Sequence, residues 1–78
     1  MEKLIVKLEE IVLLLKIRDN ESYHFFEEIL SLIKNGEENQ AINNILSSGA
    51  IIQYGDFDYL QEKKFKELYN VAKEVEKD

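Results

Sequence analysis

The residues of this sequence that come closest to a chemical motif are two aspartates on either side of a phenylalanine. Asp56 and Asp58 are two positions apart, which is the spacing of the first two ligands in a calcium-binding loop. Leu60 stands where such a loop needs a third oxygen ligand, and no glycine follows for the sharp turn. We therefore expect no metal site here, and Asp58 is better placed to cap a following helix.

The single histidine, His24, has no recognisable catalytic companions. The chain contains no cysteine, no G-x-S-x-G nucleophile motif and no glycine-rich phosphate-binding loop. Glu27 and Glu28, with Glu62 far along the chain, do not form the E-x-x-H pairs of a di-iron helical bundle. We expect His24 to be a surface or half-buried packing residue, and the sequence predicts neither an enzyme nor a cofactor site.

Hydrophobic periodicity predicts the elements that position these side chains. The expected fold is all-α, a compact four-helix, bundle-like domain with a short third helix and an irregular link before the last helix. The first helix should cover residues 2–16, and the second should follow a cap at Asp19 or Asn20 and end at Gly36. The third and fourth should cover residues 37–46 and 59–77, the last beginning with a capping box between Asp58 and Gln61.

The first of these helices has a wide apolar face. Its apolar residues cover more than half of the helical circumference: Leu4, Ile5, Leu8, Ile11, Val12, Leu13, Leu14 and Leu15. Such a helix is either central in its own domain or paired with another chain. This pattern leaves open a structural or adaptor module that forms a homodimer through its first helix.

The chain length and composition predict one domain spanning residues 1–78. Without cysteine the chain has neither disulfides nor a thiolate zinc site to support so small a fold. Its first apolar stretch is interrupted by Lys7, Glu9 and Glu10, so it resembles neither a signal peptide nor the roughly 18 apolar residues of a membrane span. We expect a cytoplasmic protein that does not enter a membrane.

Charge is distributed unevenly along the chain, whose net charge is −6. Residues 1–18 carry three acids and four bases, residues 59–78 carry five of each, and residues 19–58 carry eight acids and one base. An acidic surface repels phosphate backbones, so we do not expect a nucleic-acid ligand. It favours a basic protein partner instead, unless the acids serve only to keep a small protein soluble.

The connection GAIIQYGDFD before the last helix has only a partial structural explanation. Gly49 and Gly55 suit positions with unusual backbone angles, and residues 50–54 can be either extended or a short helical turn. Tyr54 and Asp56 have no evident structural role, so we take them as candidate contact residues.

The segment FFEEILSLIKNGEENQAINNILSSGAIIQYGDFDYL resembles small bacterial all-helical proteins of unassigned function, some of which are similar to immunity proteins for bacterial toxins. The shared features are a helix, a short x-x-G-[DE] link, a second helix that ends in a small-residue turn, and a loop with glycine and aspartate. The resemblance covers about half of the chain and implies an inhibitor of a toxin. The loop here lacks the adjacent glycines of those proteins, and no binding residue is carried over from them.

The sequence therefore predicts a non-enzymatic inhibitor that neutralises a basic toxin domain, for example a nuclease, through an acidic surface containing tyrosine. Tyrosines and acids at helix ends suit such contacts, although a tyrosine there can also simply cover the edge of the core. The candidate partner-binding residues are Tyr23, Glu37, Glu38, Tyr54 and Asp56, with Asp19 and Glu21 as peripheral charges.

Overall fold

The described part of the computed structural model, residues 1–49, 55 and 57–77, is built from α-helices and their connections. The elements are α1 (Glu2–Ile17), α2 (Tyr23–Lys34), α3 (Glu38–Leu46) and α5 (Tyr59–Lys77). These residues contain no strand, so the predicted all-α fold with a short third helix is confirmed. Whether residues 50–54 are extended or helical is a question that lies outside the described residues.

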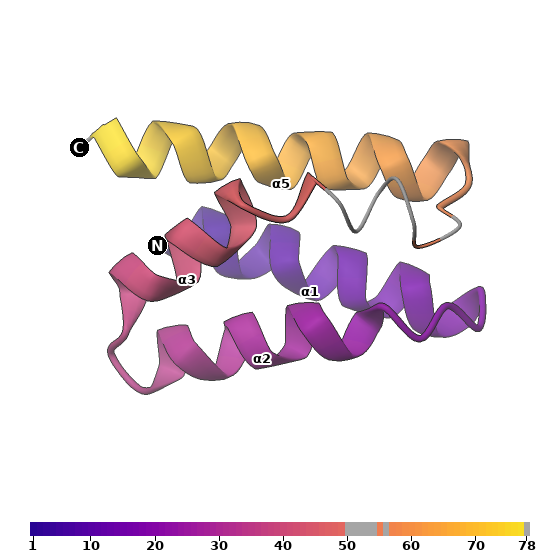
Figure 1. Cartoon of the computed structure of the whole chain (residues 1–78), viewed down its shortest axis with the longest axis horizontal. Coiled ribbons are helices and arrows are strands. Elements are labelled where there is room, and N and C mark those ends of the chain that lie inside the picture. The colour runs from indigo at the N-terminus through magenta and orange to yellow at the C-terminus, as the bar shows by residue number, and fades with distance from the viewer. Residues whose placement is uncertain (50–54, 56, 78) are drawn as a thin grey trace.

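The four helices occupy the corners of a short bundle (Figure 1). Helix α1 packs against α2 and α5, and α3 packs against the same two helices, so the order around the bundle is α1, α2, α3, α5. Helices α1 and α5 run antiparallel, and α3 rises from the end of α2 toward α5 (Figure 1). Because α1 and α3 stand at diagonal corners, the outer face of α1 and the surface of α2 and α3 lie on different sides of the molecule.

The core is made by the inward face of each helix. On α1 the buried residues recur at spacings of three and four, as one helical face requires. Across the centre, the Phe26 ring of α2 meets the Phe65 ring of α5 edge-on, with centroids 6.1 Å apart. Burying each such side chain stabilises the fold by about 1.5–3 kcal/mol. The buried apolar residues are Leu4, Leu8, Ile11, Val12, Leu15, Phe26, Ile29, Ile33, Ala41, Ile42, Ile45, Phe65, Leu68, Val71 and Ala72.

Helices α1 and α2 end in the same backbone motif. After α1, the Asn20 N–H donates to Leu15 O at 2.9 Å, and Asp19 adopts a left-handed φ of 55°. After α2, the Glu37 N–H donates to Leu32 O at 2.8 Å, and Gly36 has a φ of 84°. These six-to-one bonds satisfy carbonyls at the helix end, and the left-handed position normally favours glycine. The prediction for Gly36 is confirmed, whereas a left-handed Asp19 was not foreseen.

The polar residues before α2 and α5 organise the adjoining turns. Asp58 and Gln61 exchange two hydrogen bonds of 2.9 Å, each side chain accepting from the other residue's backbone N–H, so the predicted capping box is confirmed. Before α2, the Asn20 side chain accepts from the Ser22 N–H at 2.9 Å and donates to Gly55 O at 2.8 Å. The N-cap position of α2 is Ser22, without a side-chain cap bond, so the predicted cap at Asp19 or Asn20 is wrong. Asn20 instead orders the turn before α2, and Asp19 closes α1.

None of the helices in the described ranges is long and apolar enough to cross a lipid bilayer.

Candidate protein-binding surface

The predicted contact residues are divided between the two ends of α2. Tyr23 begins α2. Glu37 occupies the N-cap position of α3 without a side-chain cap bond, and Glu38 is the first residue of α3, beyond the other end of α2. Twelve helical residues at about 1.5 Å each put about 18 Å between the two groups. Asp19 and Glu21 lie at the Tyr23 end. Tyr54 and Asp56 lie outside the described residues, so the structure does not place them with either group.

Tyr23 covers the edge of the core. Its ring is half-buried against the core residues, lies 4.1 Å from the His24 ring, and has the Lys16 ammonium 5.2 Å from its centroid. Lys16 also bonds Glu27 at 2.9 Å, and this hydrogen bond raises the pKa of Lys16 above its ordinary value. One face of the Tyr23 ring is thus occupied by an internal contact, while His24 itself is exposed.

The part of the molecule that contains α2 and α3, residues 19–49, is called the α2–α3 half. Its acids face solvent, and most of them have no basic partner. Residues 19–49 contain six acids and a single base, Lys34. Glu27 pairs with Lys16, but the other five acids make no ion pair with any residue that the structure describes. All five are exposed: Asp19, Glu21, Glu28, Glu37 and Glu38. This half of the molecule therefore carries most of the uncompensated negative charge of the described chain.

A groove between α2 and α3 adds an apolar contact area to this acidic half. The groove has a volume of about 330 Å³; its apolar lining comes from Phe25, Ile29 and Leu32, and its polar lining from Glu28, Ser31, Gln40 and Asn44. Phe25 and Leu32 are half-buried, so part of each side chain remains accessible. An apolar centre with a polar margin is the usual composition of a protein-binding patch. The sequence pattern assigned Phe25 and Leu32 to the broad apolar side of α2 and did not indicate a groove.

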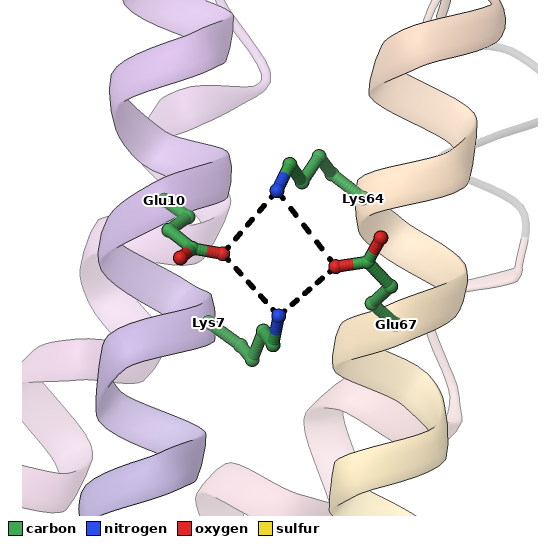
Figure 2. Close-up of polar contacts among 4 residues, drawn as sticks. All are labelled: Lys7, Glu10, Lys64 and Glu67. Atoms are coloured by element: carbon green, nitrogen blue, oxygen red, sulfur yellow. Dashed lines mark hydrogen bonds and ion pairs between the residues drawn. The ribbon is translucent and has the colours of Figure 1, made fainter.

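The α1–α5 half compensates its charges internally. Lys7 and Glu10 of α1 alternate with Lys64 and Glu67 of α5 in a closed ring of four charges (Figure 2). The ring distances are 3.0 Å for Lys7–Glu67, 3.5 Å for Lys7–Glu10, 3.5 Å for Lys64–Glu10 and 3.8 Å for Lys64–Glu67. The hydrogen bond from Lys7 lowers the pKa of Glu67 and raises that of Lys7. Such a ring ties two helices together and leaves little charge for a partner.

The charge ring was missed at the sequence level, although a signal for it exists. Both helices carry K-x-x-E, as Lys7-to-Glu10 and Lys64-to-Glu67. When two such helices run antiparallel, each lysine meets the glutamate of the other helix. Two further pairs extend the same contact, Lys3–Glu74 at 3.7 Å and Arg18–Asp58 at 3.0 Å.

Within the described ranges, no three metal-binding side chains gather closely enough to hold an ion. A scan against protein-family models, a search of curated proteins and a search of solved structures found no match to this chain. The α2–α3 surface combines exposed carboxylates with a partly apolar groove, and a protein partner could contact both.

Proposed function

We propose that this protein is a non-enzymatic inhibitor of the toxin-immunity type, which binds a basic toxin domain through the surface of α2 and α3. The observation that carries the proposal is the set of five exposed, unpaired acids on residues 19–49, a segment that contains a single base, Lys34. The resemblance of residues 25–60 to immunity-like helical proteins supports the same role.

Charge favours this kind of partner for a physical reason. Exposed carboxylates attract a cationic surface over about one Debye length, roughly 8 Å at physiological salt, and accelerate association with it. The active-site clefts of enzymes that cleave nucleic acids are cationic because their substrates carry phosphates. An acidic surface that docks into such a cleft excludes the substrate by both charge and volume.

The groove provides apolar contact area, which the charged residues alone do not supply. Surface ion pairs contribute little net affinity, so a lasting complex needs apolar area removed from water. Phe25 and Leu32 offer such an area beside Glu28. The partner is then expected to present a large apolar side chain flanked by lysine or arginine.

The experiment is a pull-down of the tagged protein from its native cells, washed across a salt series. Three forms are compared: the wild type, Glu37→Gln/Glu38→Gln, and a control, Glu62→Gln/Glu76→Gln, which removes the same charge from the α1–α5 half. We expect the wild type and the control to retain one basic protein at low salt. The Glu37/Glu38 variant should release it at a lower salt concentration, because two attracting charges are missing.

The recovered protein is then expressed alone and together with the wild type. Growth arrest by the partner alone, relieved by co-expression, supports an immunity function. Equal retention of the partner by all three forms contradicts the assignment of the α2–α3 surface. A partner that is harmless when expressed alone contradicts the toxin assignment.

A further inference from the structure

The outer face of α1 carries three large aliphatic side chains that the fold does not bury. Val6, Leu13 and Ile17 are 49%, 60% and 68% exposed. The wide apolar face expected for this helix is thus divided. Its inner part, which includes Leu4 and Leu15, is fully buried in the chain's own core, and only the outer part is left to contact another molecule.

These three residues form a stripe on one side of the helix, with Glu9 and Glu10 flanking the gap between Val6 and Leu13. Successive residues of an α-helix are rotated by about 100°, so positions 6, 13 and 17 fall within an arc of about 40°. The stripe is directed away from the core side that holds Leu8 and Leu15. Exposed aliphatic side chains aligned on one side of a helix offer an apolar contact area to a second helix.

We propose that this stripe pairs with the same stripe of a second copy, with the two α1 helices antiparallel. In this register Val6 faces Ile17 of the second copy, and the two Leu13 side chains lie side by side near the two-fold axis. The contact is self-complementary, as a two-fold interface requires.

Charge along the stripe selects the antiparallel direction. Glu9 and Lys16 lie on the same flank of the stripe, and Glu9 has no ion-pair partner among the described residues. Lys16 bonds Glu27 of its own chain at 2.9 Å, so in the dimer its ammonium would be shared between Glu27 and Glu9 of the second copy. In the antiparallel register Glu9 of one copy lies within about 3 Å, measured along the helix axis, of Lys16 of the other. Two such pairs form by symmetry. In a parallel two-fold pair the flank that carries Glu9 and Lys16 would face the opposite flank of the second copy, so Glu9 would not meet Lys16.

The charge ring removes an obstacle to this pairing. Glu10 lies beside the stripe, on the flank opposite to Glu9, and a free carboxylate there would oppose burial of the stripe. Its side chain is held by Lys7 and Lys64, each at 3.5 Å, which draws the carboxylate toward α5 and compensates its charge (Figure 2). The same ring that joins α1 to α5 thus leaves the stripe mainly apolar.

The start of α5 can extend the contact. Arg18 and Asp58 join the end of α1 to the start of α5 at 3.0 Å, and the neighbouring Tyr59 and Leu60 are 81% and 39% exposed. Because α1 is diagonal to α3, pairing through α1 leaves the α2–α3 groove accessible. The dimer therefore does not depend on the proposed inhibitor function.

Cysteine cross-linking tests the register directly, because the chain has no cysteine of its own. We would prepare Val6→Cys and Ile17→Cys and oxidise each alone and in an equal mixture. The antiparallel register brings residue 6 of one copy within disulfide distance of residue 17 of the other. The expected result is a covalent dimer in the mixture and little in either sample alone. Self-linking of Val6→Cys would overturn the antiparallel arrangement.

Sedimentation equilibrium measures the dimer from about 1 µM to about 1 mM. Leu13→Glu should weaken dimerisation at least about tenfold, because it places two carboxylates at the centre of the contact. Glu9→Lys and Lys16→Glu should each weaken it, and the double variant should restore it. A wild type that remains monomeric over the whole range would overturn the proposal.

Discussion

In the α1–α5 half of the molecule, acids and bases alternate across the helix contact, whereas in the α2–α3 half the acids face solvent. The two halves use charged residues in different roles, one to join helices and the other to form an exposed surface. Lys7, Glu10, Lys64 and Glu67 neutralise one another within hydrogen-bonding or ion-pair distance. Glu28, Glu37 and Glu38 find no base among the described residues. The paired charges help to hold the helices together, whereas the unpaired charges are available for ion pairs with a binding partner.

The largest effect on stability is expected from a substitution in the core, and it tests whether the two halves share that core. Phe26→Ala should destabilise the protein by about 3–5 kcal/mol, because Phe26 is fully buried and contacts Phe65 of the other half. Denaturant unfolding should show a single lowered transition by circular dichroism and tyrosine fluorescence. Lys66→Ala, at an exposed position of α5, serves as the control and should change stability by less than about 0.5 kcal/mol. Two separate transitions in Phe26→Ala would mean that the halves unfold independently.

The next prediction concerns the left-handed residues that follow α1 and α2, Asp19 and Gly36. Gly36→Ala should cost about 1 kcal/mol, because the left-handed backbone disfavours a Cβ even where no atom lies within 4 Å of it. Asp19→Gly, at the equivalent position after α1, should stabilise by no more than about 0.5 kcal/mol, since the relief of strain is offset by a freer unfolded chain. Thermal unfolding measures both. A stabilising Gly36→Ala would show that Gly36 does not need its left-handed conformation.

A smaller effect concerns the charge ring and its pH dependence. Because Lys7 lowers the pKa of Glu67 in the folded state, the unfolded state binds the proton more readily. The stabilising contribution is therefore complete above the unfolded pKa and is lost as the pH falls through the folded pKa. Wild type should lose more stability than Glu67→Gln as the pH is lowered from about 6 to about 3. Parallel losses in the two proteins would show that the ring contributes nothing measurable.

The smallest effect is expected on the α2–α3 surface. Glu28→Gln removes an exposed acid with no partner in the described chain, so the free energy of unfolding should change by less than about 0.5 kcal/mol. Raising the salt concentration should reduce the stability difference between wild type and Glu67→Gln and leave Glu28→Gln equal to wild type. A Glu28→Gln loss as large as that of Glu67→Gln would remove the distinction between the two halves.

Most of the fold, and little of the candidate site, could be predicted from the sequence. The beginning of α5 was predictable because Asp58 and Gln61 bond each other over three residues, which needs no distant contact. The acidic character of residues 19–58 was also visible in the chain. The separation of Tyr23 from Glu37 and Glu38 was not, because a list of charges contains no information on which end of α2 each residue occupies. The Phe25–Leu32 groove depends on where α3 crosses α2, which periodicity does not specify.

Local interactions were therefore determined by the sequence alone: four amphipathic helices, the glycine that ends α2, the capping box before α5 and the sign of the charge in the middle of the chain. The tertiary structure decided which side of a broadly apolar helix became core. Leu15 and Leu13 of α1 are the same residue type two positions apart, yet one is fully buried and the other is 60% exposed. It also decided which acids of α1 and α5 pair with a base of the other helix, because the two ring pairs that join these helices link residues 60 and 54 positions apart. Those outcomes depend on how helices distant in the chain pack together, and hydrophobic burial selects that packing for the whole molecule at once.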